Sequence, residues 1–166
     1  MLTCYDVADY FIWLANDVGS FLSNLKLQKL VYYAQAWHLA IHGEPLFEED
    51  FEAWPHGPVI PSLYEKYKKF SWKPIQKEVI EPRMPREVIK FLEEVTDVYF
   101  ACDAYDLERM THQEDPWNLA RGSLPIHDPS SNIINKKWMK EYYAAHATEV
   151  EEEDEEAEDL DKAYAL

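Results

Sequence analysis

The first apolar pattern in the chain has the spacing of a helix. Its large side chains recur every three or four positions, at Val7, Tyr10, Phe11 and Leu14. Thr3 and Asp6 stand just before this run with the spacing of a capping box, although Asp replaces the usual Glu or Gln. Gly19 is typical of a helix end. The pattern predicts a helix that begins after Thr3 and ends at Gly19.

The second pattern is longer and gives the clearest helical signal in the chain. Its apolar members share one face and are Leu27, Leu30, Val31, Ala34, Trp37 and Ile41. Ser23 or Asn24 can cap the start of this helix, and Gly43 followed by Pro45 ends it.

The segment FEAWPHGPVIP, residues 51–61, is different. Its three prolines and Gly57 exclude a helix, whereas residues 51–54 have the composition of a short strand that enters a turn. Pro61 is well placed as the first residue of a helix that runs to about Phe70. Residues 72–85 are predicted to form a loop, and a strand at 75–80, if it forms, would pair with the first one in a minor sheet.

Three or four further helices are predicted after Pro85. The longest follows Pro85, with an apolar face made by Val88, Phe91, Leu92, Val95, Val98, Tyr99 and Cys102. Asp103 can cap a short helix through Met110, and a last helix can begin at Ser130, Ser131 or Asn132. The sequence therefore predicts a mainly α protein: one compact helical domain over residues 1–147 with a small inserted β element, followed by an acidic, flexible tail over residues 148–166.

The composition agrees with one packed domain. Hydrophobic residues make up 47% of the 166 positions, enough to fill a single core. The two cysteines, Cys4 and Cys102, form no C-x-x-C pair and are expected as small core residues in a reducing compartment. The apolar stretch at 10–15 is too short for a membrane span or a signal segment. We therefore expect a cytoplasmic protein with no membrane partner.

The net charge of the chain indicates which classes of molecule it can bind. The chain carries a net charge of −16, of which residues 148–166 contribute −9 through ten acids and one lysine. Acids outnumber Lys and Arg by 32 to 16, which makes nucleic acid a poor partner and favours a protein with a basic surface. The tail either keeps the protein soluble, or engages a basic surface, or offers the final AYAL to a protease or unfoldase.

The segment MTHQEDPWNLAR, residues 110–121, gathers several polar groups. Asp115 before Pro116 has the form of a helix start, with the carboxylate accepting from free backbone N–H groups. His112 would end the preceding helix, whose dipole favours a partly protonated ring, and Arg121 could reach back to Glu114 or Asp115. The alternative is a pocket in which His112, Asp115 and Arg121 act as acid, base and anion clamp, but no nucleophile accompanies them.

Two other groups of residues are candidates for a site. His38 and His42 are four residues apart on one helix, a spacing that can hold a metal ion, but the glutamate of the H-E-x-x-H pattern is absent. Their ordinary interpretation is surface histidines near a helix C-terminus, so we predict neither a metal nor a cofactor. Trp54 and His56 flank Pro55 in a rigid turn, where Trp54 is either a recognition group or a plug for the core.

Two segments resemble a known family. NLKLQKLVYYAQAWHLAIHGEPLFEEDFEAWPHGPVIPSLYEKY (24–67) and LERMTHQEDPWNLAR (107–121) resemble the Panacea domain of the SocA-like antitoxins, which also occurs in phage-associated proteins. The resemblance covers about residues 3–145 and implies a non-enzymatic module that neutralises a cognate toxin by direct contact. The alternative that it implies is an adaptor that delivers the bound partner to a cytoplasmic protease.

The resemblance also marks individual positions. The residues that match the family are Lys26, Leu27, Gln28, Lys29, Leu30, Tyr32, Trp37, Trp54, Gly57, Pro58, Val59, Tyr64, Thr111, His112, Pro116, Trp117 and Arg121. The candidates for partner binding or for the family signature are Lys26, Gln28, Tyr32, Trp37, Trp54, His56, Tyr64, His112, Asp115, Trp117 and Arg121.

Overall fold

The protein is mainly α-helical, as predicted, in the computed structural model, which describes residues 1–147. The elements are α1 (Cys4–Val18), α2 (Asn24–His42), β1 (Glu52–Trp54), β2 (Gly57–Val59), α3 (Pro61–Tyr67), the 3-10 helix η1 (Lys68–Phe70), α4 (Arg86–Tyr99), α5 (Ala104–His112) and α6 (Asp115–Arg121). Residues 136–147 are also helical and are called helix 136–147 below. Within residues 1–147, no helix combines the length and apolar composition that crossing a bilayer requires.

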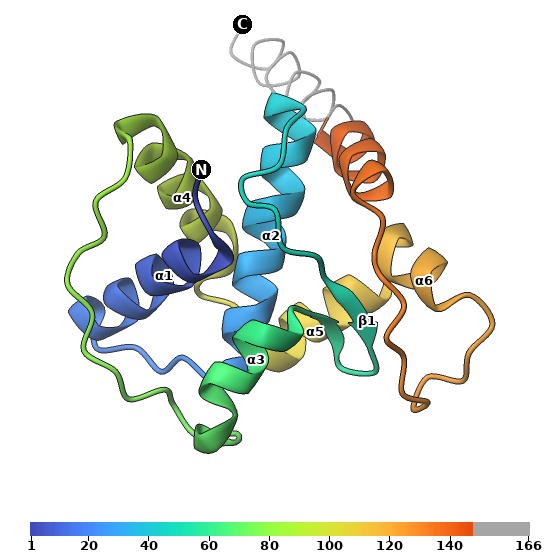
Figure 1. The fold of residues 1–166 in the computed structure, drawn as a ribbon, viewed down its shortest axis with the longest axis horizontal. Helices are drawn as coiled ribbons and strands as arrows, with labels where there is room; N and C mark the ends of the chain where they lie inside the picture. Colours follow the sequence, from blue (N-terminus) through green and yellow to red (C-terminus); the bar gives the residue numbers. More distant parts are fainter. Residues whose placement is uncertain (148–166) are drawn as a thin grey trace, which may run out of the picture.

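Helix α2 is the centre of the fold. It contacts α1, α3, α4, α5 and strand β2, and Figure 1 shows it running between α1 and α4 on one side and the hairpin and α6 on the other. Because neighbours surround it, α2 is buried along most of its length, including polar residues such as Gln28 and Gln35. The single apolar face predicted from the sequence was therefore too narrow, since a helix surrounded by protein is buried on all sides.

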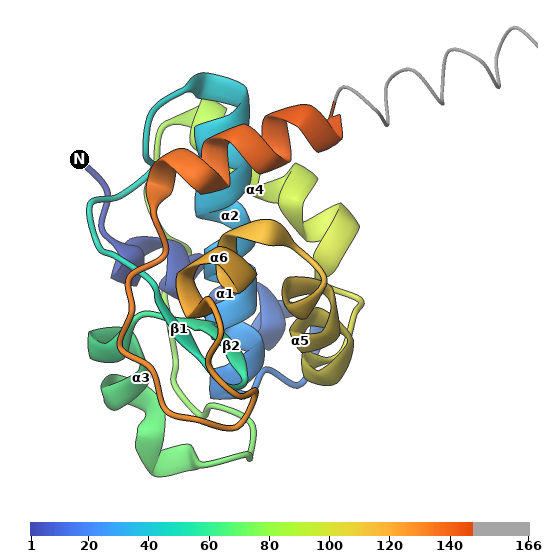
Figure 2. The same cartoon turned by 90° about the vertical axis from the view of Figure 1, so that its right-hand side faces the viewer.

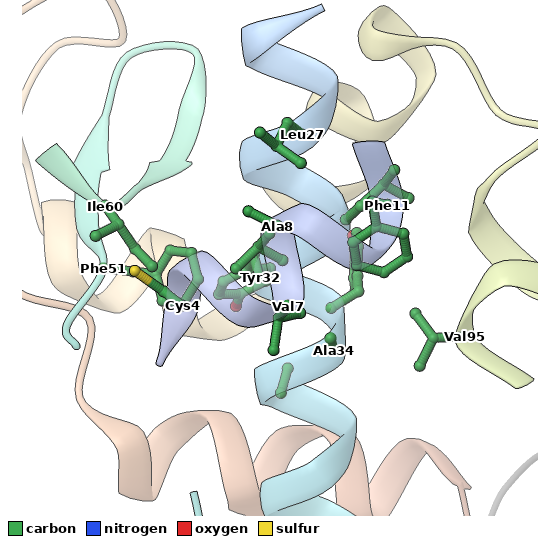
Figure 3. Packing of buried hydrophobic residues seen from close by; sticks show 14 of the residues in the cluster. Cys4, Val7, Ala8, Phe11, Leu27, Tyr32, Ala34, Phe51, Ile60 and Val95 are labelled. Atoms are coloured by element: carbon green, nitrogen blue, oxygen red, sulfur yellow. The ribbon is translucent and has the colours of Figure 1, made fainter. Parts of the chain in front are cut away.

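The core forms where α1 crosses α2. Figure 3 shows Val7 and Phe11 of α1 beside side chains of α2, with Phe51 and Ile60 from the chain around the hairpin at one edge. Tyr32 is fully buried in this core, and its ring meets that of Phe51 edge-to-face with centroids 5.2 Å apart. Cys4 is buried as predicted, whereas Cys102 is half-buried at the margin of the core.

Three of the predicted helix caps, at Thr3, Ser23 and Asp103, are confirmed. Thr3 and Asp6 form a reciprocal capping box, in which the Thr3 N–H donates to Asp6 Oδ2 at 2.8 Å. Ser23 caps α2, and Asp103 caps α5 by accepting from the Asp106 N–H at 2.8 Å. Each of these caps satisfies a backbone donor that the helix itself leaves free.

The predicted strand at 75–80 is wrong. Residues 74–85 have no regular structure and run past α1 and the turn that follows it: the Ile75 N–H donates to Leu22 O at 2.8 Å, and Asn16 Nδ2 donates to Lys77 O at 2.8 Å. Strand β1 pairs instead with β2 in an antiparallel hairpin. The sequence signal for β2 was hidden because Pro58 lies in it, and proline cannot donate to a strand ladder.

The start of the last helix was also predicted too early. Residues 132–134 are bound in extended form to the chain at β1, where the Ala53 N–H donates to Asn132 O at 2.9 Å and the Ile134 N–H donates to Phe51 O at 2.8 Å. These long-range bonds hold the segment that the sequence assigned to the first turn of the helix. The helix begins only at residue 136.

The central position of α2 gives a prediction about stability. Leu30→Ala should lower the free energy of unfolding by about 2–5 kcal/mol, because Leu30 is fully buried and the substitution leaves a cavity. Ile41→Ala on the same helix removes a side chain that is 57% exposed and should change it by no more than about 0.5 kcal/mol. Urea unfolding of the two variants and the wild type measures both effects, and equal losses would contradict this packing.

Candidate functional site

Buried polar side chains of α2 hold the β1–β2 hairpin. Lys29 is 1% exposed, and its ammonium donates to Pro58 O at 3.0 Å. The Gln28 side chain accepts from the Ile60 N–H at 3.0 Å and donates to Asn24 Oδ1 at 3.1 Å. These two family-matching residues satisfy backbone groups that the two strands cannot pair with each other.

Helix α6 holds the hairpin from the other side. Trp117 Nε1 donates to Trp54 O at 2.9 Å. Arg121 is 4% exposed and donates to Ala53 O at 2.9 Å, and also to Pro125 O and Asp128 O at 2.7 and 2.9 Å. The predicted reach of Arg121 back to Glu114 or Asp115 is therefore wrong, because its guanidinium donors bind buried carbonyls instead.

His112 packs against Trp117 of α6. Its ring stacks on Trp117 with centroids 4.1 Å apart, and its Nε2 has no hydrogen-bond partner among residues 1–147. Burial lowers the pKa of His112 below the ordinary histidine value, despite the opposing influence of the Glu108 carboxylate. The structure thus favours a neutral ring, contrary to the predicted partial protonation at a helix end.

Asp115 does not cap α6. It is the exposed first residue of the helix, and the preceding residue, Glu114, occupies the cap position without using its side chain there. The Glu114 carboxylate instead accepts from Tyr33 at 2.6 Å and Tyr143 at 2.8 Å, which connects α2 to helix 136–147. Burial raises the pKa of Glu114.

Some of the other predicted site residues are buried and bond to the rest of the protein, and others lie on the surface. Tyr32 is fully buried, and its hydroxyl oxygen lies 3.2 Å from that of Tyr143, whose proton is donated to Glu114. Lys26 donates to Phe100 O at 2.6 Å, at the end of α4. His112, Asp115 and Arg121 share no common pocket geometry, because Arg121 is bound inside the protein and Asp115 faces solvent.

The exposed end of the hairpin presents Trp54 and His56. Trp54 is half-buried, its ring lies 5.0 Å from that of Tyr64, and it borders a hollow of about 530 Å³ between Pro55 and Ser130. The His56 side chain is 69% exposed and lies 2.9 Å from Glu108 Oε1. Trp54 is therefore not a core plug, and both residues are accessible on a turn that the buried side chains hold rigid.

A second groove, of about 490 Å³ and mostly apolar, lies among α2, α4, α5 and helix 136–147; Figure 2 shows α4 and α5 at the right and helix 136–147 across the top. Its apolar lining includes Trp37, Ile41, Phe91, Val95, Val98 and Met110. Trp37 was among the predicted residues, and its Nε1 donates to Tyr99 Oη at 2.6 Å. Ile41 and Val98 were assigned to core-facing stripes, but they are 57% and 63% exposed. The sequence pattern marked them as apolar and could not show that, in the described part of the chain, they are left exposed.

His38 and His42 lie side by side, with ring centroids 4.6 Å apart, and both rings contact Phe91. His38 Nδ1 lies 2.6 Å from Glu44 O, so the protonated nitrogen donates to this carbonyl. In the part of the chain that the structure describes, no three His, Cys, Asp or Glu residues are grouped so that they could hold a metal ion.

Comparison with known proteins addresses the family resemblance. Residues 27–118, more than half of the chain, match the family described as Antitoxin SocA-like, Panacea domain. The chain belongs to this family. It is also 30% identical over 111 residues to Antitoxin SocA of Caulobacter vibrioides (strain NA1000 / CB15N), a match that covers 59% of this chain and 59% of that protein. No solved structure gave a significant match.

The matched range contains most of the positions that the resemblance marked, although Lys26 and Arg121 lie just outside it. It begins in α2, includes the hairpin and ends in α6, so it contains both Lys29 and Trp117. Residues 148–166 lie outside the matched range and outside the described residues, so the predicted flexibility of the acidic tail stays a prediction.

Gly57 provides a test of the close packing under the hairpin. Its φ is +106°, and a Cβ there would lie 2.5 Å from Lys29 Cε and 3.0 Å from Thr111 Oγ1. Because the buried ammonium of Lys29 is bound to Pro58 O, it cannot move away without losing that bond. Gly57→Ala should lower the free energy of unfolding by about 3 kcal/mol or more.

Gly19→Ala is the matched control, because Gly19 also has a positive φ, +67°, but has nothing within 4 Å of a Cβ. It should lower the free energy of unfolding by only about 1–2 kcal/mol. Denaturant unfolding measures the free energy of unfolding of both variants. Equal decreases would show that the positive φ alone accounts for the destabilisation in each.

The buried ammonium predicts a dependence of stability on pH. Burial lowers the pKa of Lys29 to about 7 in the folded protein, whereas the unfolded chain has the ordinary value near 10.5. Between these values the unfolded chain binds more protons, so the contribution of Lys29 to stability rises with pH and decreases as pH falls toward 7.

The measurement is the free energy of unfolding of the wild type and of Lys29→Met between pH 7 and 9. As pH rises, the free energy of unfolding of the wild type should increase relative to that of the variant by up to about 1.4 kcal/mol per pH unit. A difference that stays constant across this range would mean that Lys29 keeps its proton in the folded protein.

Proposed function

We propose that this protein is an antitoxin that neutralises a toxin by direct contact, and that the apolar groove is the contact surface. The observation that carries the proposal is the groove itself, an open hollow of about 490 Å³ whose apolar margin includes Ile41 and Val98. Exposed apolar hollows of this kind are typical of protein interaction sites. Membership of an antitoxin family and the printed name of the relative from Caulobacter vibrioides support the assignment.

The charges around the groove favour a basic partner. Glu94 lines it, and Glu87 lies two helical turns earlier on the same side of α4. The chain leaves the groove at Ala147 and continues directly into the residues that carry a net charge of −9. A toxin surface with apolar side chains surrounded by Lys or Arg would be complementary to this arrangement.

We infer that neutralisation needs no catalysis by this chain. Of the three residues considered as a reactive set, Arg121 binds backbone carbonyls and His112 stacks on Trp117, so both have structural roles. The two free thiols, Cys4 and Cys102, suit a reducing compartment, and we place the activity in the cytoplasm.

The adaptor alternative depends on residues 148–166. These residues lie outside the described part of the chain, and none of the contacts given above within residues 1–147 bears on delivery to a protease. We therefore keep direct neutralisation as the proposed function.

Co-expression with the product of the neighbouring gene tests the proposal. The wild type should restore growth and copurify with that product. Ile41→Asp and Val98→Asp place a charge in the groove at exposed positions, so each should weaken the complex by about thirtyfold, the effect of losing one central contact, without unfolding the protein.

Leu119→Asp is the matched control, because Leu119 lies on α6, is 54% exposed and does not line the groove. It should neutralise as well as the wild type. Failure of the wild type to restore growth or copurify would argue against this toxin as the partner. Normal neutralisation by both groove variants would exclude the groove as the contact.

A further inference from the structure

A second surface of the protein has the opposite charge to the rest. Residues 61–77, which include α3, η1 and the turn after them, carry five lysines and one glutamate in a chain whose net charge is −16. Lys66, Lys68, Lys69 and Lys73 are exposed, whereas Lys77 is paired with Asp9 at 3.1 Å. Residues 61–77 sum to +4, and to +3 when Asp9 is included; Lys68 also lies 3.6 Å from Glu65. This positive charge is effective near the surface because salt screens the distant acids over about 8 Å at physiological ionic strength.

Exposed aromatic residues accompany these lysines. Trp72 is 78% exposed and Phe21 is 79% exposed. The bond from the Ile75 N–H to Leu22 O, 2.8 Å long, joins the two segments that carry them. We call Phe21, Trp72 and the exposed lysines of residues 66–73 the lysine–tryptophan surface.

The turn that presents Trp72 is fixed and strained. Ser71, the residue before it, has a φ of 56°, which is unfavourable for a residue with a side chain. Two backbone bonds of 3.0 Å hold the turn, from the Ser71 N–H to Lys68 O and from the Lys73 N–H to Phe70 O. These bonds fix the backbone that presents Trp72, so little backbone entropy is lost when it binds a partner.

The chemistry of this surface specifies its occupant. It requires a segment that is strongly anionic and also carries some apolar side chains. Residues 149–161 contain ten acids, and Leu160, Tyr164 and Leu166 lie within or just after them. We propose that the lysine–tryptophan surface of one molecule binds the acidic segment 149–161 of a second copy of this chain.

The distance between the lysine–tryptophan surface and the start of the acidic segment favours binding between copies. Figures 1 and 2 both show helix 136–147, which leads into the acidic segment, at the opposite end of the molecule from α3. A domain of this size has a radius of gyration of about 15 Å, which gives a path of about 60 Å around its surface. Thirteen fully extended residues span at most about 45 Å, so most of the acids cannot reach the lysines of their own molecule.

Such a contact joins two different surfaces, so it is head-to-tail and can be repeated from one copy to the next. The lysine–tryptophan surface is separate from the groove proposed for the toxin, because the groove lies on other elements.

Sedimentation equilibrium of full-length protein tests the proposal. The wild type should self-associate at about 50 mM salt and dissociate progressively toward about 500 mM. The lysine variant carries Lys68→Gln, Lys69→Gln and Lys73→Gln, and the acid variant carries Glu151→Gln, Glu152→Gln, Glu153→Gln, Glu155→Gln and Glu156→Gln. Each should weaken association by about tenfold or more, since each removes several charges from one side of the contact.

The matched control removes three lysines elsewhere, with Lys90→Gln, Lys137→Gln and Lys140→Gln, all exposed and outside the lysine–tryptophan surface. It changes the net charge by the same amount as the lysine variant but leaves the lysine–tryptophan surface intact. It should therefore associate within about twofold of the wild type. A loss equal to that of the lysine variant would overturn the proposal.

Mixing the two defective variants provides the decisive measurement. The lysine variant keeps its acidic segment and the acid variant keeps its lysines, so an equimolar mixture should form heterodimers through one intact contact and stop there. The proposal is overturned if the mixture stays monomeric or if the wild type is monomeric at low salt. It is also overturned if a peptide of residues 149–166 or a phosphatidylglycerol vesicle binds the lysines while the wild type does not self-associate.

Discussion

The buried backbone carbonyls of the β1–β2 hairpin impose the main constraint on this fold. Two strands of three residues cannot satisfy the groups that face α2 and α6, and an unpaired buried carbonyl is costly. Lys29, Trp117 and Arg121 supply the missing donors from helices on opposite sides of the hairpin. Because these three donors come from positions far apart in the chain, α2, the hairpin and α6 must assemble together. The two segments that carry the family resemblance contain these elements, which gives a physical reason for them to occur together.

This constraint separates the residues that maintain the structure from those available for binding. Lys29 and Arg121 have long cationic side chains of the kind often found in binding sites, but here their charged groups lie inside the protein and contact the backbone. The surfaces that remain include apolar residues that are exposed and that no element within residues 1–147 covers, such as Ile41 and Val98. A rigid interior thus supports surfaces whose side chains can change with little effect on stability. Such an arrangement allows the binding surfaces to change while the fold is kept.

Local signals in the sequence predicted most of the helices but little of the candidate site. A capping box such as that of Thr3 and Asp6 depends on four consecutive residues, so its pattern is visible without the fold. The pairing of Ala53 with Pro58 depends on donors from distant helices, and the late start of helix 136–147 depends on bonds from residues 132–134 to the chain at β1. Apolar periodicity placed Val98 on one face of α4 but could not show that this face stays uncovered. Long-range contacts decided each of these differences.

The distribution of charge connects the two proposed surfaces. The groove lies close to the point where the chain enters its most acidic segment, whereas the lysines around η1 lie at the other end of the molecule. Self-repulsion within a chain of net charge −16 would be reduced if each acidic segment met the lysines of another copy. A basic toxin that engages the same acids would compete with that contact, since one set of carboxylates cannot neutralise both. The two associations would then be thermodynamically linked, and toxin binding would favour the dissociated form of the protein.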